Sequence, residues 1–147
     1  MTATSSRPAA LRPGLILRSI GLVVAVGLAV DAVVHLRLAA DYQLAAPAGI
    51  GQGNLFRIAA GAAVLTALWL LVRPSRLSFA AAFLVAGGAL GAVLLYRYVD
   101  VPALGPVPSM YEPLWFPEKT FSAVAEAVAA GAALVGLART RVPAVVR

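Results

Sequence analysis

Four long apolar stretches constrain the fold of this chain more than any other feature. They cover about residues 15–36, 55–72, 78–98 and 119–138. Each is close to the roughly 20 residues that a helix needs to cross the hydrocarbon core of a bilayer. The 147 residues are 61% hydrophobic and 12% charged, so a soluble core of this size would leave too much apolar surface in water. The pattern predicts an all-α, four-transmembrane-helix bundle formed by a single integral membrane domain, residues 1–147.

The charges predict how the bundle is oriented. Both tails, residues 1–14 and 139–147, and the turn between the second and third stretches contain basic residues and no acidic ones. Positively charged segments are retained on the cytoplasmic side. We therefore expect a multi-pass protein of the cell (plasma) membrane with both termini in the cytoplasm. The eight basic residues on this side are Arg7, Arg12, Arg18, Arg73, Arg76, Arg139, Arg141 and Arg147.

Composition also limits the classes of function. The chain has no cysteine, which excludes disulfides, thiolate metal sites and cysteine nucleophiles. Its basic residues are spread over short membrane-flanking segments, so we expect no nucleic-acid partner. The apolar stretch after MTATSSRPAALR is longer than the core of a usual signal peptide, which favours a retained first span. The expected partner is the lipid bilayer, and a membrane-protein partner or a homo-oligomer is left open.

Two loops are predicted outside the membrane, at about 38–53 and 99–118. The second, VDVPALGPVPSMYEPLWFPE, contains five prolines, which prevent a regular helix and stiffen the chain. Its aromatic residues suit the headgroup layer. This loop is therefore either an interfacial connector or a lid over a site. Asn54 and Ser75 are the expected N-caps of the second and third helices.

The acidic residues within the spans mark a candidate site. Asp31 lies inside the first apolar stretch, where an ionisable group costs a few kcal/mol (~3) unless it finds a partner. His35 is four residues further on and therefore on the same helical face. Glu126 lies about 10 Å deep in the fourth span, so the two carboxylates are expected to face one another and share a proton. Arg57 and Arg97 are the expected neutralising partners.

Several kinds of site remain open from these residues. Asp31, His35 and Glu126 are the candidates both for catalytic groups and for metal ligands, although one histidine without a thiol is a thin ligand set. Asp100 lies three residues from Arg97, a spacing that suits an ion pair. The full set of predicted ligand-binding residues is Asp31, His35, Tyr42, Arg57, Arg97, Asp100, Glu112, Trp115 and Glu126.

Three motifs carry a resemblance to known proteins. They are DAVVHLRLAADY at 31–42, LYRYVDVPALGPVP at 95–108 and MYEPLWFPEK at 110–119. Together they resemble a small uncharacterised actinobacterial family of four-helix integral membrane proteins, and the architecture is loosely similar to that of DoxX-like proteins. The resemblance implies the four-helix fold over most of the chain and assigns no activity, cofactor or site residue.

These observations lead to one leading hypothesis of function and two alternatives. In the first, an outward-facing polar site binds a small amphipathic ligand (a quinone or a lipid headgroup) or a metal, as in a redox or accessory protein. In the second, the charges pair helices within a structural or assembly subunit of a larger membrane complex. In the third, a membrane enzyme uses Asp31 and Glu126 as acid and base. No cofactor is identified by the sequence.

Overall fold

The computed structural model describes residues 13–140, which form four α-helices. All four are long and apolar enough to cross a membrane, so the predicted all-α membrane architecture is confirmed at this level. The side of the membrane on which each end lies stays a prediction. The helices are α1 (Pro13–Ala45), α2 (Gln52–Val72), α3 (Arg76–Tyr98) and α4 (Pro117–Arg139).

Local sequence explains where the later helices begin. Ser75 caps α3 as predicted, in a reciprocal box in which the Ser75 and Ser78 side chains each accept from the other's backbone N–H. Pro117 occupies the first turn of α4, where a missing N–H costs nothing. The prediction for α2 was wrong, because its N-cap is Gly51. Asn54 lies inside the first turn and donates to the carbonyl of Ile50 instead.

The first helix continues nine residues beyond the predicted end at 36, to Ala45. Hydropathy detects the segment that fits in lipid, whereas the helix continues as long as one of its faces has a partner. Beyond residue 36 that partner is α2: Ala39 is buried, and the Tyr42 ring packs on Phe56 with centroids 5.0 Å apart. The first connecting loop is therefore short, covering residues 46–51 rather than 38–53.

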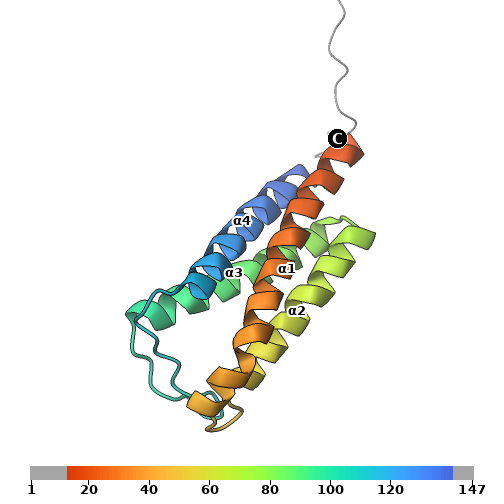
Figure 1. The fold of residues 1–147 in the computed structure, drawn as a ribbon. Helices are drawn as coiled ribbons and strands as arrows, with labels where there is room; N and C mark the ends of the chain where they lie inside the picture. The colour runs from red at the N-terminus through yellow and green to blue at the C-terminus, as the bar shows by residue number, and fades with distance from the viewer. Residues whose placement is uncertain (1–12, 141–147) are drawn as a thin grey trace, which may run out of the picture.

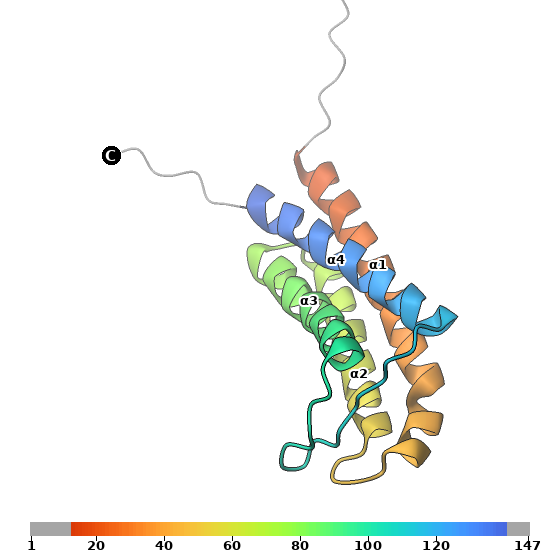
Figure 2. The same cartoon turned by 90° about the vertical axis from the view of Figure 1, so that its left-hand side faces the viewer.

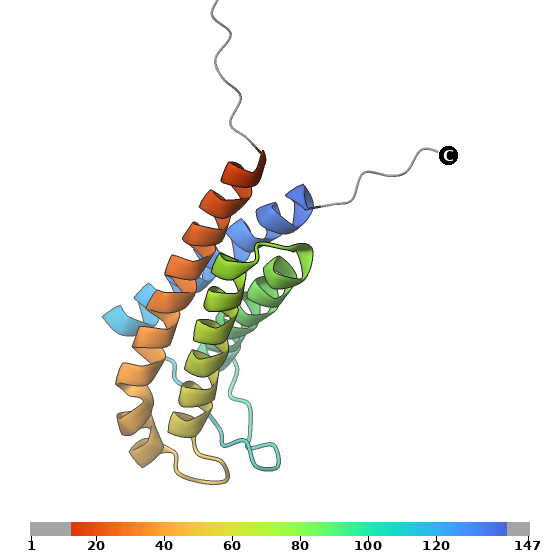
Figure 3. The same ribbon diagram turned by 90° about the vertical axis from the view of Figure 1, so that its right-hand side faces the viewer.

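The bundle has loops of different character at its two ends. The start of α1, the end of α4 and the α2–α3 turn lie at one end, and the α1–α2 and α3–α4 loops lie at the other (Figures 1 to 3). We call the second end the loop end. Helix α1 packs on α2 and α4, and α3 packs on α4, whereas α2 and α3 contact each other much less. The bundle is therefore less closely packed between α2 and α3.

The two loops at the loop end are tied to each other and to α3. The backbone N–H of Ile50 donates to the carbonyl of Pro106 at 2.8 Å, and that of Glu112 donates to the carbonyl of Tyr96 at 3.0 Å. Gly105 has a positive φ of 57°, which permits the tight turn between Leu104 and Val107. These bonds fix the path of the proline-rich segment across the end of the bundle.

Gly27 allows the close approach of α1 and α4 one turn before Asp31. A Cβ at this position would lie 2.9 Å from both the Ala125 carbonyl oxygen and the Ala129 Cβ. We expect Gly27→Leu to force the two helices apart and to lower the free energy of unfolding by about 2 kcal/mol, as overpacked cores do. Unfolding by sodium dodecyl sulfate in mixed micelles measures this change.

The matched control is Gly61→Leu on α2. A Cβ at Gly61 has no neighbour within 4 Å, so this substitution should leave the stability within about 0.5 kcal/mol of the wild type. Equal effects of the two substitutions would contradict a tight α1–α4 crossing at Gly27.

Candidate functional site

Asp31 and His35 form a hydrogen-bonded pair on successive turns of α1, which is an ion pair when the imidazole is protonated. The His35 Nδ1 lies 2.8 Å from the Asp31 Oδ1 and 3.1 Å from the Asp31 backbone oxygen. Both of these partners are acceptors, so Nδ1 carries the hydrogen in this arrangement. Asp31 is only 1% exposed. The predicted i, i+4 pairing of these two residues is therefore present, and it holds the imidazole in a fixed orientation.

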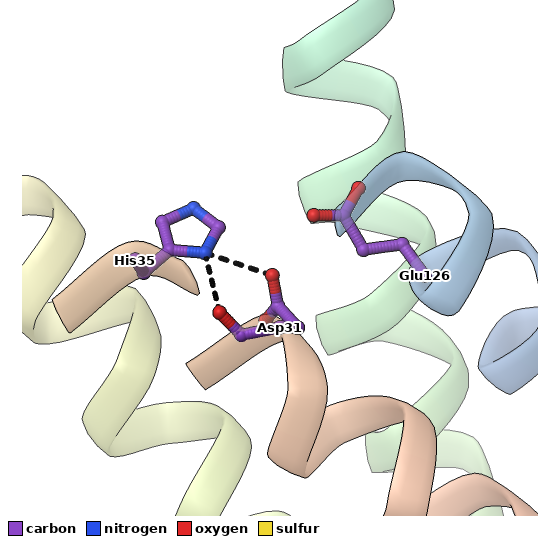
Figure 4. A group of neighbouring side chains, drawn as sticks. All are labelled: Asp31, His35 and Glu126. Carbon is purple, nitrogen blue, oxygen red and sulfur yellow. Dashed lines mark hydrogen bonds and ion pairs between the residues drawn. The ribbon is translucent and has the colours of Figure 1, made fainter. Parts of the chain in front are cut away.

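Glu126 reaches the same place from α4. Figure 4 shows its carboxyl group directed toward Asp31 and His35 across the α1–α4 interface. The Ser122 hydroxyl lies between the two acids, 3.1 Å from the Asp31 Oδ1 and 2.8 Å from the Glu126 Oε1. One atom each of Asp31, His35 and Glu126 lies within 4.8 Å of the others. We call these three residues the triad.

The triad contains more acceptors than donors. The Ser122 hydroxyl has one hydrogen, so it can donate to only one of its two carboxyl neighbours at a time. The Asp31 Oδ2 and the Glu126 Oε2 are buried without a hydrogen-bond partner among residues 13–140. Among the residues that the structure describes, no Arg or Lys forms an ion pair with either acid. The arrangement is therefore short of positive charge and can accept a proton or a cation.

The predicted neutralising arginines lie elsewhere. Arg57 donates to the Asn54 side chain, one turn away on α2. The Arg97 guanidinium lies over the Tyr98 ring at 4.9 Å and the Trp115 ring at 5.9 Å. The expected Arg97–Asp100 ion pair is not formed in the described part of the chain. Planar guanidinium groups stack well on aromatic rings, and these nearby contacts replace the predicted ones.

A cavity of about 200 Å³ lies between the helices toward the loop end. Its walls are mainly apolar, from all four helices and the α3–α4 loop. Small side chains of α2 and α3, including Ala59 and Ala89, line it, and these two helices contact each other less than α1 contacts α2 or α3 contacts α4. His35 and Ser122 also line the cavity, so they form the boundary that it shares with the triad.

Lys119 provides a positive charge at the cavity wall. It is 9% exposed, and its Nζ donates to the backbone carbonyls of Glu112 and Leu114. An ammonium group has three hydrogens, so one remains for a further acceptor. Its nearest rings, Trp115 and Phe116, have centroids 5.8 Å from Nζ. Lys119 thereby joins the proline-rich loop to the first turn of α4, beside the cavity.

The structure separates the predicted ligand-binding residues into three groups. His35, Tyr42 and Glu112 line the cavity, and Asp31 and Glu126 lie in the triad beside it. Arg57, Arg97, Asp100 and Trp115 are not among its lining residues. Three residues of the loop at 99–118, Met110, Glu112 and Phe116, form part of the cavity wall, and whether this loop is a connector or a lid stays a prediction.

Sequence reasoning missed two residues of the site. Ser122 shares a face of α4 with Glu126 because it lies four residues earlier, but its contact with Asp31 depends on how α1 and α4 cross. The second missed residue is Lys119, at the start of the fourth apolar stretch. Its burial depends on the loop carbonyls that fold back over it, and no spacing in the sequence indicates this contact.

No protein-family model, no curated protein sequence and no solved structure matches the chain. The resemblance to actinobacterial and DoxX-like membrane proteins is tested by none of these comparisons and stays a prediction. The geometry of the site is therefore the basis for assigning a function.

Proposed function

We propose that this chain is an integral membrane binding protein that accepts the head of a small amphipathic molecule in the cavity beside the triad. The proposal depends above all on the cavity itself, which combines apolar walls with polar groups from His35, Ser122 and Lys119. Binding pockets for small molecules characteristically combine a largely apolar lining with a few convergent polar groups. A purely structural ion network would not need such a space next to it.

The size of the cavity indicates how much of a ligand it would hold. Apolar cavities of about 150 Å³ bind benzene, so about 200 Å³ suits one substituted ring or a compact headgroup. Pockets for whole drug-sized ligands begin at about 300 Å³. An apolar tail would therefore extend away from the site, toward lipid. A benzoquinone ring and a lipid headgroup share this chemistry of an oxygen-bearing head on an apolar tail.

The polar groups favour oxygen acceptors on the ligand. Lys119 uses two of its hydrogens on backbone carbonyls and retains one for a ligand oxygen. Ser122 lies one turn further along α4 than Lys119, and its side chain and the His35 ring also line the cavity. A quinone, with two ring oxygens, would place one of them on Lys119 and the other beside Ser122 or His35. A phosphate or carboxylate headgroup would use Lys119 alone.

The enzyme alternative has less support from the geometry. Asp31 and Glu126, its predicted acid and base, are not among the residues that line the cavity. A substrate in the cavity would meet His35 and Ser122 first. A proton would therefore have to pass through one of these two side chains.

Filling the cavity tests the proposal. Ala59 lines the cavity on α2, and we expect Ala59→Phe to place a phenyl ring in the space that the ligand head would occupy. Affinity should fall at least tenfold, or about 1.4 kcal/mol. The measurements are native mass spectrometry of the detergent-purified protein and titration with decylubiquinone or phosphatidylglycerol in nanodiscs.

Gly61→Phe is the matched control, because it adds the same ring to α2 where no neighbour lies within 4 Å. It should bind like the wild type. Binding of decylubiquinone alone would identify a quinone site, and binding of phosphatidylglycerol alone would identify a headgroup site. Retention of either ligand by Ala59→Phe would contradict the cavity as the site. An empty wild-type protein that binds neither probe would favour the structural or assembly alternative.

A further inference from the structure

The triad has the ligand types and the spacing of a metal site. It offers one imidazole nitrogen and two carboxylate oxygens within 4.8 Å of one another, from two different helices. Bonds of about 2.1 Å hold the ligands of a zinc-sized ion about 3–4 Å apart. Closing these three groups onto an ion therefore requires side-chain shifts on the order of 1 Å. The 2.8 Å separation of His35 Nδ1 and Asp31 Oδ1 is already close to that of adjacent ligands.

Two buried oxygens point independently to a missing partner. In the described part of the chain the Asp31 Oδ2 and the Glu126 Oε2 have no hydrogen-bond partner, and both residues are only 1% exposed. Leaving a buried carboxyl oxygen without a partner in a bilayer-spanning bundle is costly. Ser122 cannot satisfy these two atoms, since its single hydrogen is donated either to the Asp31 Oδ1 or to the Glu126 Oε1. A bound group that accepts electron pairs would remove this cost.

Charge balance selects the class of ion. An ion held by both carboxyl groups would bind them in their ionised form, which carries two negative charges, and the described chain places no Arg or Lys in an ion pair with them. A divalent cation bound through a neutral imidazole would cancel both charges within the site. Imidazole favours first-row transition ions, and carboxylates favour hard cations. Magnesium and calcium prefer sites made of oxygen ligands alone, so the histidine disfavours them. The combination suits Zn²⁺ or Mn²⁺, and the absence of cysteine makes Cu⁺ a poor fit.

We propose that Asp31, His35 and Glu126 bind one divalent transition-metal ion between α1 and α4. The ion would take the place of the Nδ1 hydrogen that His35 shares with Asp31. Three protein ligands leave at least one coordination position free, as in metal sites that act on a bound molecule. Ser122 lies between the two acids and lines the cavity, so this position faces the cavity. The metal site does not depend on a ligand in the cavity.

Metal binding should be measured on the full chain, purified without a polyhistidine tag and stripped with a chelator. We expect isothermal titration with Zn²⁺ to give one site per chain, and Mn²⁺ to give an immobilised electron paramagnetic resonance signal at the same stoichiometry. Glu126→Gln should weaken Zn²⁺ binding on the order of 100-fold or more, because even residues that only orient a ligand contribute 10–100-fold. Zn²⁺ should also raise the unfolding temperature of the wild type and not that of Glu126→Gln.

Glu118→Gln is the matched control. Glu118 is an exposed acid two turns earlier on α4, so this variant should bind Zn²⁺ like the wild type. If Glu126→Gln fails to fold, the absorption spectrum of Co²⁺ in the wild type tests the proposal, because nitrogen and oxygen ligation of Co²⁺ gives visible bands. A wild type that binds neither Zn²⁺ nor Mn²⁺ and shows no Co²⁺ bands would overturn it. Unchanged Zn²⁺ affinity in Glu126→Gln would also overturn the proposal. A proton shared by Asp31 and Glu126 would then account for the charge of the triad.

Discussion

We expect His35→Ala to lower the free energy of unfolding of the metal-free protein by about 3–5 kcal/mol, the usual cost of removing one partner of a buried ion pair. The substitution removes the Nδ1–H group that lies 2.8 Å from the Asp31 Oδ1. Two buried carboxyl groups would then have only the Ser122 hydrogen between them. Unfolding by sodium dodecyl sulfate in mixed micelles, with chelator present, measures the loss.

The size of this loss distinguishes two physical causes. A hydrogen bond between membrane helices contributes about 0.6 kcal/mol on average, so a loss of that size would mean that only one bond was broken. A loss of several kcal/mol means that buried negative charge was left without compensation. A measured change below about 1 kcal/mol would contradict the prediction and would show that the acids are neutral in the folded protein.

Two control variants separate charge from packing. The His35 ring packs edge-on against Phe56, with centroids 4.9 Å apart, and such a contact contributes about 1 kcal/mol. His35→Phe keeps an aromatic ring but removes the donor, so it should be almost as destabilised as His35→Ala. Arg37→Ala changes an exposed residue of the same helix and should be neutral within about 0.5 kcal/mol.

The four spans were predictable from sequence because lipid imposes a strict length of apolar residues on each one. The ends of the helices were less predictable from the sequence. Ser75 was predicted as a cap because its signal is local, and the box with Ser78 confirms it. The end of α1 was missed because it depends on packing against α2, where Ala39 and Tyr42 continue the buried face. Hydropathy contains no information about that contact.

The site was predictable only in its buried acids. Asp31, His35 and Glu126 were recognisable because ionisable residues within a span are costly and must find partners, and the structure brings all three together. The predicted partners of Arg57 and Arg97 were wrong because these long side chains contact an acceptor or ring close to them in the chain instead. The cavity could not be predicted at all, since it follows from how far α2 lies from α3.

Replacing the whole triad with apolar residues is expected to recover the stability that His35→Ala loses. In the variant Asp31→Leu, His35→Phe and Glu126→Met, no buried charge or unpaired oxygen remains, and the new side chains have comparable size. Exchanging a buried ionic network for packed apolar residues is often neutral or stabilising by about 1–4 kcal/mol. Ser122 can then donate to the carbonyl four residues earlier in its helix.

This variant should unfold at the wild-type concentration of sodium dodecyl sulfate or above it, and it should bind no Zn²⁺. Together with the instability of His35→Ala, such a result would show that the fold tolerates the triad but does not require it. Buried ionisable residues that lower stability and are not needed to align the helices indicate a binding function. If the apolar variant were instead less stable than His35→Ala, the triad would be needed to align α1 with α4. The assembly alternative would then explain the buried charges better than the binding function does.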